Sequence, residues 1–330
     1  MRIRTQRGVA LITAVAIVAI AAAVAVKIAF AHQVWFRQME NVGERDATDA
    51  LRRGALHWAS VALLEDAAQN STDHLGEAWA QGLPTLPVDG GAIHVAVEDA
   101  QGRFNLNNLV MNNQVSAQDV AVFQRLLVLL KLDPLLSNAV VDWIDPDSNV
   151  TSPGGAEDVD YLILKTPYRA PNQPMTSIDE LRMIKGFDEK TVETILPYVT
   201  VLPPGVRTTI NVNTAPPVVL AALVGRDVAW AERIAEDRVS KPMNNVGELT
   251  QQLPAGTQLP TGMASVKTDF FLITLDTSIG RHQRRTVALM QRAGNATNWI
   301  WFKPEPLIDA VAVQSSGTAQ SGTDESAPAR

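Results

Sequence analysis

Residues 9–26 read VALITAVAIVAIAAAVAV, and this stretch decides how the whole chain is organised. Every residue in it is apolar apart from Thr13, and no charge follows until Lys27. At about 1.5 Å per residue, a helix of this length covers roughly 27 Å, which is close to the ~30 Å hydrocarbon thickness of a bilayer. The stretch therefore predicts one membrane-spanning helix, extended to about residue 31 because Lys27 can reach back to the headgroups.

The charges before this stretch give its orientation. Arg2, Arg4 and Arg7 precede the apolar residues, and no acidic residue lies among them. The positive-inside rule then places the N-terminus in the cytoplasm and the rest of the chain on the other side of the membrane. We expect a single-pass protein with most of its mass outside the cytoplasm.

The junction between the leader and the apolar stretch predicts a processing site. Gly8 closes a short basic leader directly before Val9, as in the substrates of prepilin peptidases, so cleavage is expected after Gly8. The alternative is a secretory signal peptide cut near Ala29 and Ala31. The apolar stretch is longer than the usual apolar core of a signal peptide, which favours the first interpretation.

The helical pattern continues beyond the membrane. Residues 34–68 place apolar side chains at helical intervals among charged ones, with only Gly43 and Gly54 as weak points. One long helix is therefore expected, half inside the membrane and half outside. Its outer half is expected to pack on partner helices through Val34, Leu51, Leu56 and Leu63.

The composition excludes several kinds of protein. The 330 residues are 46% hydrophobic and 19% charged, which is typical of globular domains and excludes a multi-span or wholly disordered chain. The absence of Cys excludes a disulfide framework, a thiolate metal site and a Cys nucleophile. A formal net charge of -7 disfavours a protein that neutralises nucleic-acid phosphates.

Beyond the long helix, the sequence alternates between strand and helix patterns. Residues 92–109, AIHVAVEDAQGRFNLNNL, predict a β-hairpin around residues 100–102. Residues 116–144 return to helical spacing, with Pro134 opening a second helix. Two strand-like stretches then flank residues 278–280, and the chain ends in a Ser/Gly/Ala/Thr-rich tail. The order predicts an α+β fold with a helical insertion.

The helical part contains an internal repeat. Residues 181–195 recur 39 positions later as residues 220–234, and each copy predicts a helix, a Gly turn at Gly186 or Gly225, and a second helix. A partial third start is visible because PMTSIDEL from residue 174 is echoed by PMNNVGEL from residue 242. Ser177 and Asn245 are the expected N-caps of the helices that begin there.

An acidic loop is the strongest candidate for a metal site. No basic residue occurs between Lys131 and Lys165, whereas seven acidic residues do. Asp145, Asp147 and Asn149 occupy alternate positions of a Pro/Gly-rich loop, a pattern that suits a hard cation such as calcium. The spacing is not that of an EF-hand, and a solvated acidic loop without metal is the alternative.

Two other functions receive little support. The sequence lacks HExxH, G-x-S-x-G and P-loop motifs, so no enzyme is predicted, although a two-carboxylate hydrolase stays an alternative. The repeat resembles helix-hairpin-helix modules that grip a DNA phosphate. Residues 174–253 hold 8 Lys and Arg against 10 Asp and Glu, so a packing role is favoured over nucleic-acid binding. A membrane-tethered DNA receptor is the alternative function.

Several motifs together resemble the K-class minor pseudopilins of the type II secretion system, the GspK-like family. They are RGVALITAV from residue 7, GRFNLNNL from 102, DWIDPDSNVTSPGGAEDVDY from 142, SIDELRMIKGF from 177 and INVNTAPPVVLAAL from 210. The fifth residue of the mature chain is Thr13, where most pilin-like proteins carry Glu. This departure also resembles the K class.

The resemblance implies a fold, a place in an assembly and a metal. It implies a pilin-like fold in which a long N-terminal helix packs on an antiparallel sheet, with a large inserted all-α domain. It implies a non-enzymatic subunit that caps or initiates the tip of the periplasmic pseudopilus for protein export. It also implies calcium, which we assign to Asp145, Asp147, Glu157, Asp158 and Asp160.

The same resemblance gives the expected partners and location. The partners are the minor pseudopilins of the I and J classes and of the H class, together with the prepilin peptidase that would methylate Val9 and the inner-membrane secretion platform. The chain is expected in the inner membrane with its bulk in the periplasm, and no nucleic acid is expected.

The expected domain boundaries follow from these patterns. Residues 1–8 form the leader and 9–31 the transmembrane half of the helix. Residues 32–112 carry the rest of the helix and the first strands, 113–264 the inserted helical domain, 265–302 the closing strands and 303–330 a flexible tail.

Overall fold

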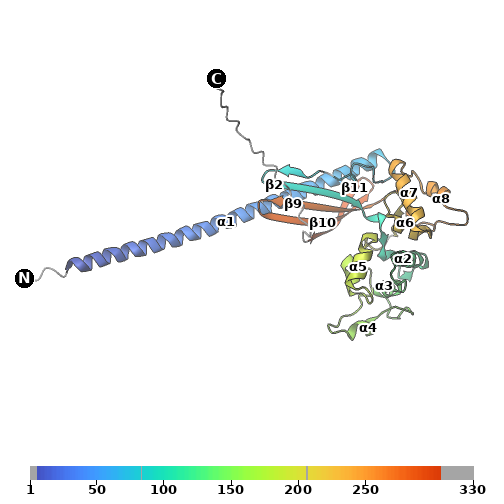
Figure 1. The fold of residues 1–330 in the computed structure, drawn as a ribbon, viewed down its shortest axis with the longest axis horizontal. Coiled ribbons are helices and arrows are strands. Elements are labelled where there is room, and N and C mark those ends of the chain that lie inside the picture. The colour runs from blue at the N-terminus through green and yellow to red at the C-terminus, as the bar shows by residue number, and fades with distance from the viewer. Residues whose placement is uncertain (1–5, 83, 206, 306–330) are drawn as a thin grey trace, which may run out of the picture.

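The structure is a computed structural model that describes residues 6–82, 84–205 and 207–305 (Figure 1). One long helix, α1 (Gln6–Gln69), lies along a five-stranded sheet, and we call this unit the body. The sheet has the order β1-β2-β9-β10-β11 and every neighbouring pair is antiparallel. Its strands are β1 (Leu86–Val88), β2 (Gly91–Asp99), β9 (Phe270–Ile279), β10 (His282–Ala293) and β11 (Ala296–Glu305). The predicted fold class is confirmed.

The first half of α1 packs against nothing in the described part of the chain. Val9, Ile17 and Phe30 are each more than 60% exposed. Among the described residues, α1 is the one helix long and apolar enough to cross a membrane. The chain therefore has the form of a single-pass anchor followed by folded domains.

The second half of α1 covers the sheet and forms the core of the body. Leu56 and Leu63 are buried against Phe271 and Ile273 of β9. The expectation that these two leucines pack on partner helices is wrong, because residues seven apart share one helix face and the chain's own sheet takes that face. Leu51 is half-buried at the same core.

The inserted domain interrupts the sheet between two adjacent strands. β2 and β9 are antiparallel neighbours, with Val95 opposite Leu275. The chain between them leaves the sheet after β2 and returns only at β9, so the whole insertion replaces what could have been a short hairpin turn. In Figure 1 this domain lies at the end of the body opposite the N-terminus.

The prediction of a β-hairpin over residues 92–109 is wrong, because residues 100–109 form no strand that pairs with β2. β2 ends at Asp99, whose carboxylate accepts the backbone N–H of Gln101 and starts the 3-10 helix η1 (Ala100–Gly102). The Gln101 side chain then donates to the Thr209 carbonyl and accepts the Asp269 N–H. These bonds turn the chain into the inserted domain, where β3 (Phe104–Asn105) pairs in parallel with β6 (Val199–Thr200).

The inserted domain is mostly helical and has its own core, separate from that of the body. Its helices are α2 (Ala117–Leu129), α3 (Leu136–Ile144), α4 (Asp158–Leu162), α5 (Glu189–Ile195), α6 (Pro217–Val224), α7 (Val228–Ser240) and α8 (Val246–Gln252). Short 3-10 helices are η2 (Leu106–Leu109), η3 (Ile178–Met183) and η4 (Leu196–Tyr198). The remaining short strands are β4 (Val110–Met111), β5 (Gln114–Val115), β7 (Ile210–Asn211) and β8 (Ala264–Ser265).

The inserted domain contains two copies of one arrangement. In the first, the Asn107 side chain bonds both backbone groups of Met175, at 2.9 and 3.0 Å. In the second, Asn213 bonds both backbone groups of Met243, each at 2.9 Å. Each copy closes with a parallel strand pair, β3 with β6 and β7 with β8. The Pro-Met pairs at residues 174–175 and 242–243 therefore mark the two copies. This duplication spans more of the chain than the repeat of residues 181–195 at residues 220–234.

The shorter repeat is also present. η3 and α5 flank Gly186, and α6 and α7 flank Gly225, both with positive φ, 87° and 68°. Ser177 caps η3 as expected, through a capping box with Glu180. Asn245 precedes α8, but its side chain makes no capping bond.

The structure moves two of the expected boundaries. β3 and η2 already belong to the inserted domain, so it begins near residue 104 rather than 113. β11 runs to Glu305, so residues 303–305, expected in the tail, form the end of a strand because they pair with β10. Residues 1–5 of the expected leader and 306–330 of the expected tail lie outside the described residues.

Candidate functional site

The predicted processing site lies in the first turns of α1. Gly8 and Val9 are the third and fourth residues of α1, which starts at Gln6. The Thr13 hydroxyl donates to the carbonyl oxygens of Val9 and Ala10, at 3.1 and 2.9 Å. A hydroxyl bonded to its own helix brings no unmet polar group into an apolar environment. Thr13 therefore fills its position without charge.

The acidic loop, residues 145–160, joins the end of α3 to the start of α4. Asp145 caps α3 and Glu157 precedes α4, and their side chains are buried, at 6% and 2% exposed. Within the described chain, Asp145 Oδ1 and both carboxylate oxygens of Glu157 have no hydrogen-bond partner. Buried carboxylates without donors are costly unless a positive charge compensates them.

The electrostatics of this loop favour protonation or a cation. Burial, and then the charges of Asp142 and the other acids, raise the pKa of Glu157 to about 7. Burial, followed by the charges of Asp147 and Asp142, raises the pKa of Asp145 to about 6. The structure thus brings Asp145, Asp147 and Glu157, three of the predicted ligands, into one negative field.

The other two predicted ligands face basic side chains. Asp158 forms an ion pair with Arg169 and also accepts the Ala170 N–H at 3.1 Å. Asp160 pairs with Lys185 at 2.7 Å, and this bond lowers the pKa of its carboxyl. These two acids are already compensated within the protein, unlike Glu157 and Asp145.

Asp142 is a further acid of this site, which the predicted ligand set omits. It is fully buried, and its two oxygens each accept the Thr151 N–H at 3.1 Å, so it holds the loop in its turn. A Cβ added at Gly155 would lie 2.2 Å from Asp142 Oδ2, so this close approach requires glycine. The available sequence signal was its place at the start of the DWIDPD motif.

In each of the two helical hairpins, around Gly186 and Gly225, an Asp side chain caps the N-terminus of the second helix. The Asp188 carboxylate accepts the Thr191 N–H and the Asp227 carboxylate accepts the Trp230 N–H, both at 2.8 Å. A DNA phosphate gripped by such a hairpin needs free amides in this place. The hairpins are therefore built as packing units of the inserted domain.

Together, the long apolar N-terminal helix, the antiparallel sheet that its second half covers and the inserted helical domain define a protein of the pilin-like class. Two family models, both described as type II secretion system (T2SS), protein K, match residues 102–204 and 210–267. The type II secretion system protein K of Pseudomonas aeruginosa is 34% identical over 88% of this chain and 90% of its own length. That of Aeromonas hydrophila is 30% identical over 88% of this chain and 94% of its own. The chain belongs to the type II secretion system protein K family.

A solved structure agrees with this assignment. One chain from the crystal structure of the GspK-GspI-GspJ complex of enterotoxigenic Escherichia coli aligns with a TM-score of 0.72 and 25% identity. The alignment covers 82% of the present chain and 99% of the other. The fold is thus shared over the anchor-proximal body and the inserted domain rather than over a fragment.

Proposed function

We propose that this chain is a minor pseudopilin that caps or initiates the tip of the periplasmic pseudopilus and so serves protein export across the outer membrane. The observation that carries the proposal is the position of the inserted domain, at the end of the body opposite the N-terminus of α1 (Figure 1). We expect the subunits of such a fibre to stack along their first helices. A bulky domain at the end opposite the N-terminus of α1 would then block the addition of a subunit on the tip side of the fibre and would leave the other side free. The role is assembly and recognition, with no catalytic step.

Thr13 supports the tip position. In pilin-like fibres a Glu at this position is thought to pair with the N-terminal amine of the neighbouring subunit, which offsets the cost of a charge in lipid. A subunit at the tip has no subunit ahead of it to pair with. A hydroxyl that is satisfied by the carbonyl oxygens of Val9 and Ala10 suits this position.

Partner subunits are expected along the free face of α1. Trp58 and Val61 are 42% and 39% exposed on its outer half, and a groove of about 730 Å³ runs beside Trp58 toward Leu86 and Val88. The related structure contains GspI and GspJ. The proposal assigns this face to helices of I- and J-class partners, with an H-class subunit linking the tip to the fibre.

The acidic loop is proposed to bind calcium in the periplasm. The donor set fits, because Glu157 and Asp145 present buried carboxylate oxygens that have no hydrogen-bond donor within residues 6–82, 84–205 and 207–305. With Asp147, these residues would hold the ion, which would supply the missing positive charge between α3 and α4. Asp158 and Asp160 could join only by giving up Arg169 and Lys185.

Cleavage of the leader by prepilin peptidase directly tests whether the chain is a pilin-like protein. We propose that prepilin peptidase cuts after Gly8 and methylates Val9, and that the inner-membrane platform then extracts the chain. The experiment is the intact mass and N-terminal sequence of the protein from membranes of a host with this peptidase. A chain that starts at N-methyl-Val9 is expected. A chain that starts at Met1, or beyond Ala29, would contradict the proposal.

A further inference from the structure

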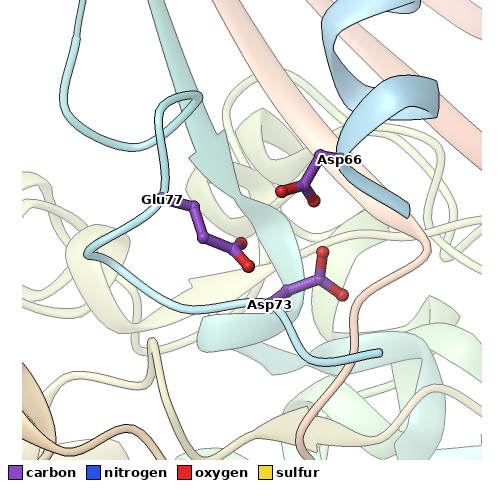
Figure 2. Close-up of side chains that lie close together, drawn as sticks. All are labelled: Asp66, Asp73 and Glu77. Atoms are coloured by element: carbon purple, nitrogen blue, oxygen red, sulfur yellow. The ribbon is translucent and has the colours of Figure 1, made fainter. Parts of the chain in front are cut away.

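A second cluster of carboxylates lies at the joint between the body and the inserted domain. Asp66 belongs to the last turn of α1, and Asp73 and Glu77 lie on the segment that follows it. Figure 2 shows the three side chains close together, and one oxygen from each lies within 4.8 Å of the others. Asp73 and Glu77 are buried, at 2% and 7% exposed.

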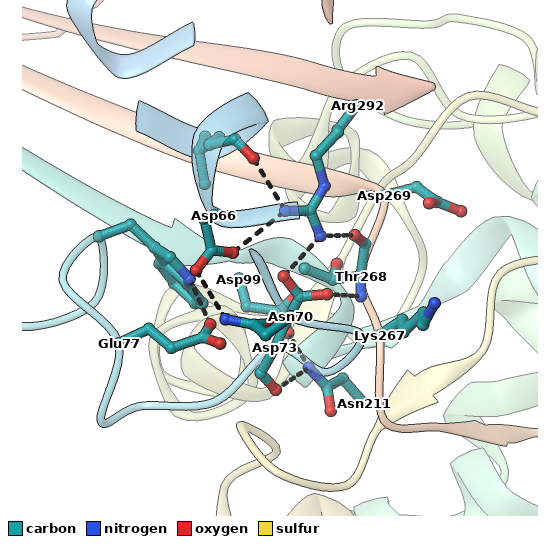
Figure 3. A network of polar contacts seen from close by, with 12 residues as sticks. Asp66, Asn70, Asp73, Glu77, Asp99, Asn211, Lys267, Thr268, Asp269 and Arg292 are labelled. Atoms are coloured by element: carbon teal, nitrogen blue, oxygen red, sulfur yellow. Dashed lines mark hydrogen bonds and ion pairs between the residues drawn. The ribbon is translucent and has the colours of Figure 1, made fainter. Parts of the chain in front are cut away.

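One cation already sits beside this cluster. Arg292 of β10 contacts Asp73 at 2.5 Å and Asp66 at 3.4 Å (Figure 3). Asp73 also accepts the Thr268 N–H at 2.8 Å. A single guanidinium against three carboxylates leaves an excess of two negative charges when all three are ionised. Burial raises the pKa of both Asp66 and Glu77.

Glu77 has a carboxylate oxygen that accepts no hydrogen bond from the residues that the structure describes. Its Oε2 accepts the Trp79 indole N–H at 2.6 Å and the His74 backbone N–H at 3.1 Å. Its Oε1 is buried without a hydrogen-bond partner, and the nearest basic atom, His74 Nε2, lies 3.7 Å away. His74 Nδ1 accepts the Gly76 N–H at 3.1 Å, which holds the ring beside this carboxylate.

We propose that Asp66, Asp73 and Glu77 form a calcium site, with Glu77 Oε1 as one ligand. The donors are all oxygens, which calcium prefers, and Ca–O bonds of about 2.3–2.6 Å place opposite ligands roughly 4.6–5.2 Å apart. The three carboxylate oxygens lie within 4.8 Å of one another, so one ion between them could reach all three. The ion supplies the positive charge that Arg292 alone does not.

The position gives this site a structural consequence. The Asp73 carbonyl accepts the side-chain N–H of Asn211, at 3.0 Å, and Asn211 opens the second copy of the inserted domain. A cation held by Asp66 and Asp73 therefore connects the end of α1 to the base of that domain. This site is independent of the calcium proposed for the acidic loop.

The test uses terbium, a calcium analogue, and the metal-free full-length protein in detergent. Glu157→Gln removes a buried ligand of the acidic loop and leaves the joint as the remaining site. Excitation of Trp79, whose indole bonds Glu77, is then expected to sensitise terbium emission that calcium displaces. Adding Glu77→Gln is expected to weaken binding at least tenfold. Glu65→Gln, on an exposed neighbour of Asp66, is the matched control and is expected to change nothing.

The outcomes separate the two sites. Equal terbium binding with and without Glu77→Gln in the Glu157→Gln background, or no binding in that background, overturns the joint site. Unchanged stoichiometry on Glu157→Gln with loss on Glu77→Gln overturns the acidic-loop site instead. If Glu77→Gln alters the circular dichroism of the protein, Asp66→Asn, at a half-buried position, replaces it with the same expected loss.

Discussion

Glu157 makes the stability of the metal-free protein depend on pH. Its folded pKa of about 7 lies above the usual 4.5, so the folded state holds this proton more tightly than the unfolded state does. The ionisation of this carboxyl therefore costs no stability below about pH 4.5 and about 3 kcal/mol above about pH 7. We expect the metal-free free energy of unfolding of the inserted domain to fall between these values, measured by urea denaturation in chelator.

A substitution isolates this contribution. Glu157→Gln is expected to remove about half of that fall, because the pKa of Asp145, raised to about 6, contributes the rest, and to raise the metal-free stability at pH 8. Calcium is expected to remove it in the unmodified protein and to have no such effect in the variant. Glu193→Gln, on the exposed side of α5, is the matched control. The same pH slope in both variants would contradict the assignment of the slope to Glu157.

Asn107 and Asn213 each hold one copy of the inserted domain together. Each is buried and bonds both backbone groups of a Met in the PM motif. Replacing either with Ala leaves buried backbone groups unpaired, so each change should lower the free energy of unfolding by about 3 kcal/mol. Asn244→Ala, at an exposed position, should cost less than about 0.5 kcal/mol. Thermal or urea unfolding measures all three, and equal losses would contradict the role.

The sequence predicts only part of each candidate site. The run of acids around Asp145 and Glu157 was visible because composition is local. The sequence did not show which of these acids form ion pairs within the protein. Asp158 pairs with Arg169 only because the folded chain brings the two side chains together. The cluster around Glu77 was missed for the same reason, since Arg292 lies more than 200 positions from it.

Among the elements, the outer half of α1 has one face that packs on the sheet and one face that is exposed. Leu63 is buried against the sheet, so Leu63→Ala is expected to cost about 2–5 kcal/mol of stability. Trp58 is 42% exposed on the free face, so Trp58→Ala should change stability little but weaken binding to the I- and J-class partners about tenfold. Melting curves and pull-down titrations separate the two effects. Loss of binding with Leu63→Ala alone would contradict this division.

The elements themselves were largely predictable from periodicity. The apolar spacing gave α1, β9 and β10 because each carries a long and regular pattern. The supposed hairpin after β2 was wrong because Asp99 and Gln101 form side-chain bonds that no alternation pattern encodes. The buried face of α1 was misassigned because an amphipathic helix does not reveal whether its partner is its own sheet or another chain.

For the whole molecule, two separate cores predict two unfolding transitions. The core of the body forms between α1 and the sheet, and the core of the inserted domain is a distinct cluster around residues such as Phe123 and Leu220. A small third cluster, in which Leu202 packs with Phe270 and Leu289, joins the two. Calorimetry of the full chain is expected to resolve both. Glu157→Gln should move the transition of the inserted domain and leave the other in place. A single transition that shifts as a unit would contradict this organisation.

The central claim is that this chain occupies the tip of a pseudopilus. The most direct measurement is native mass spectrometry of the detergent-solubilised chain mixed with the I- and J-class pseudopilins of the same secretion system. The account predicts a stable complex that contains one copy of each protein and does not take up a second copy of this chain. A chain that stays alone with both partners, or that stacks on further copies of itself as a shaft subunit does, would contradict the account.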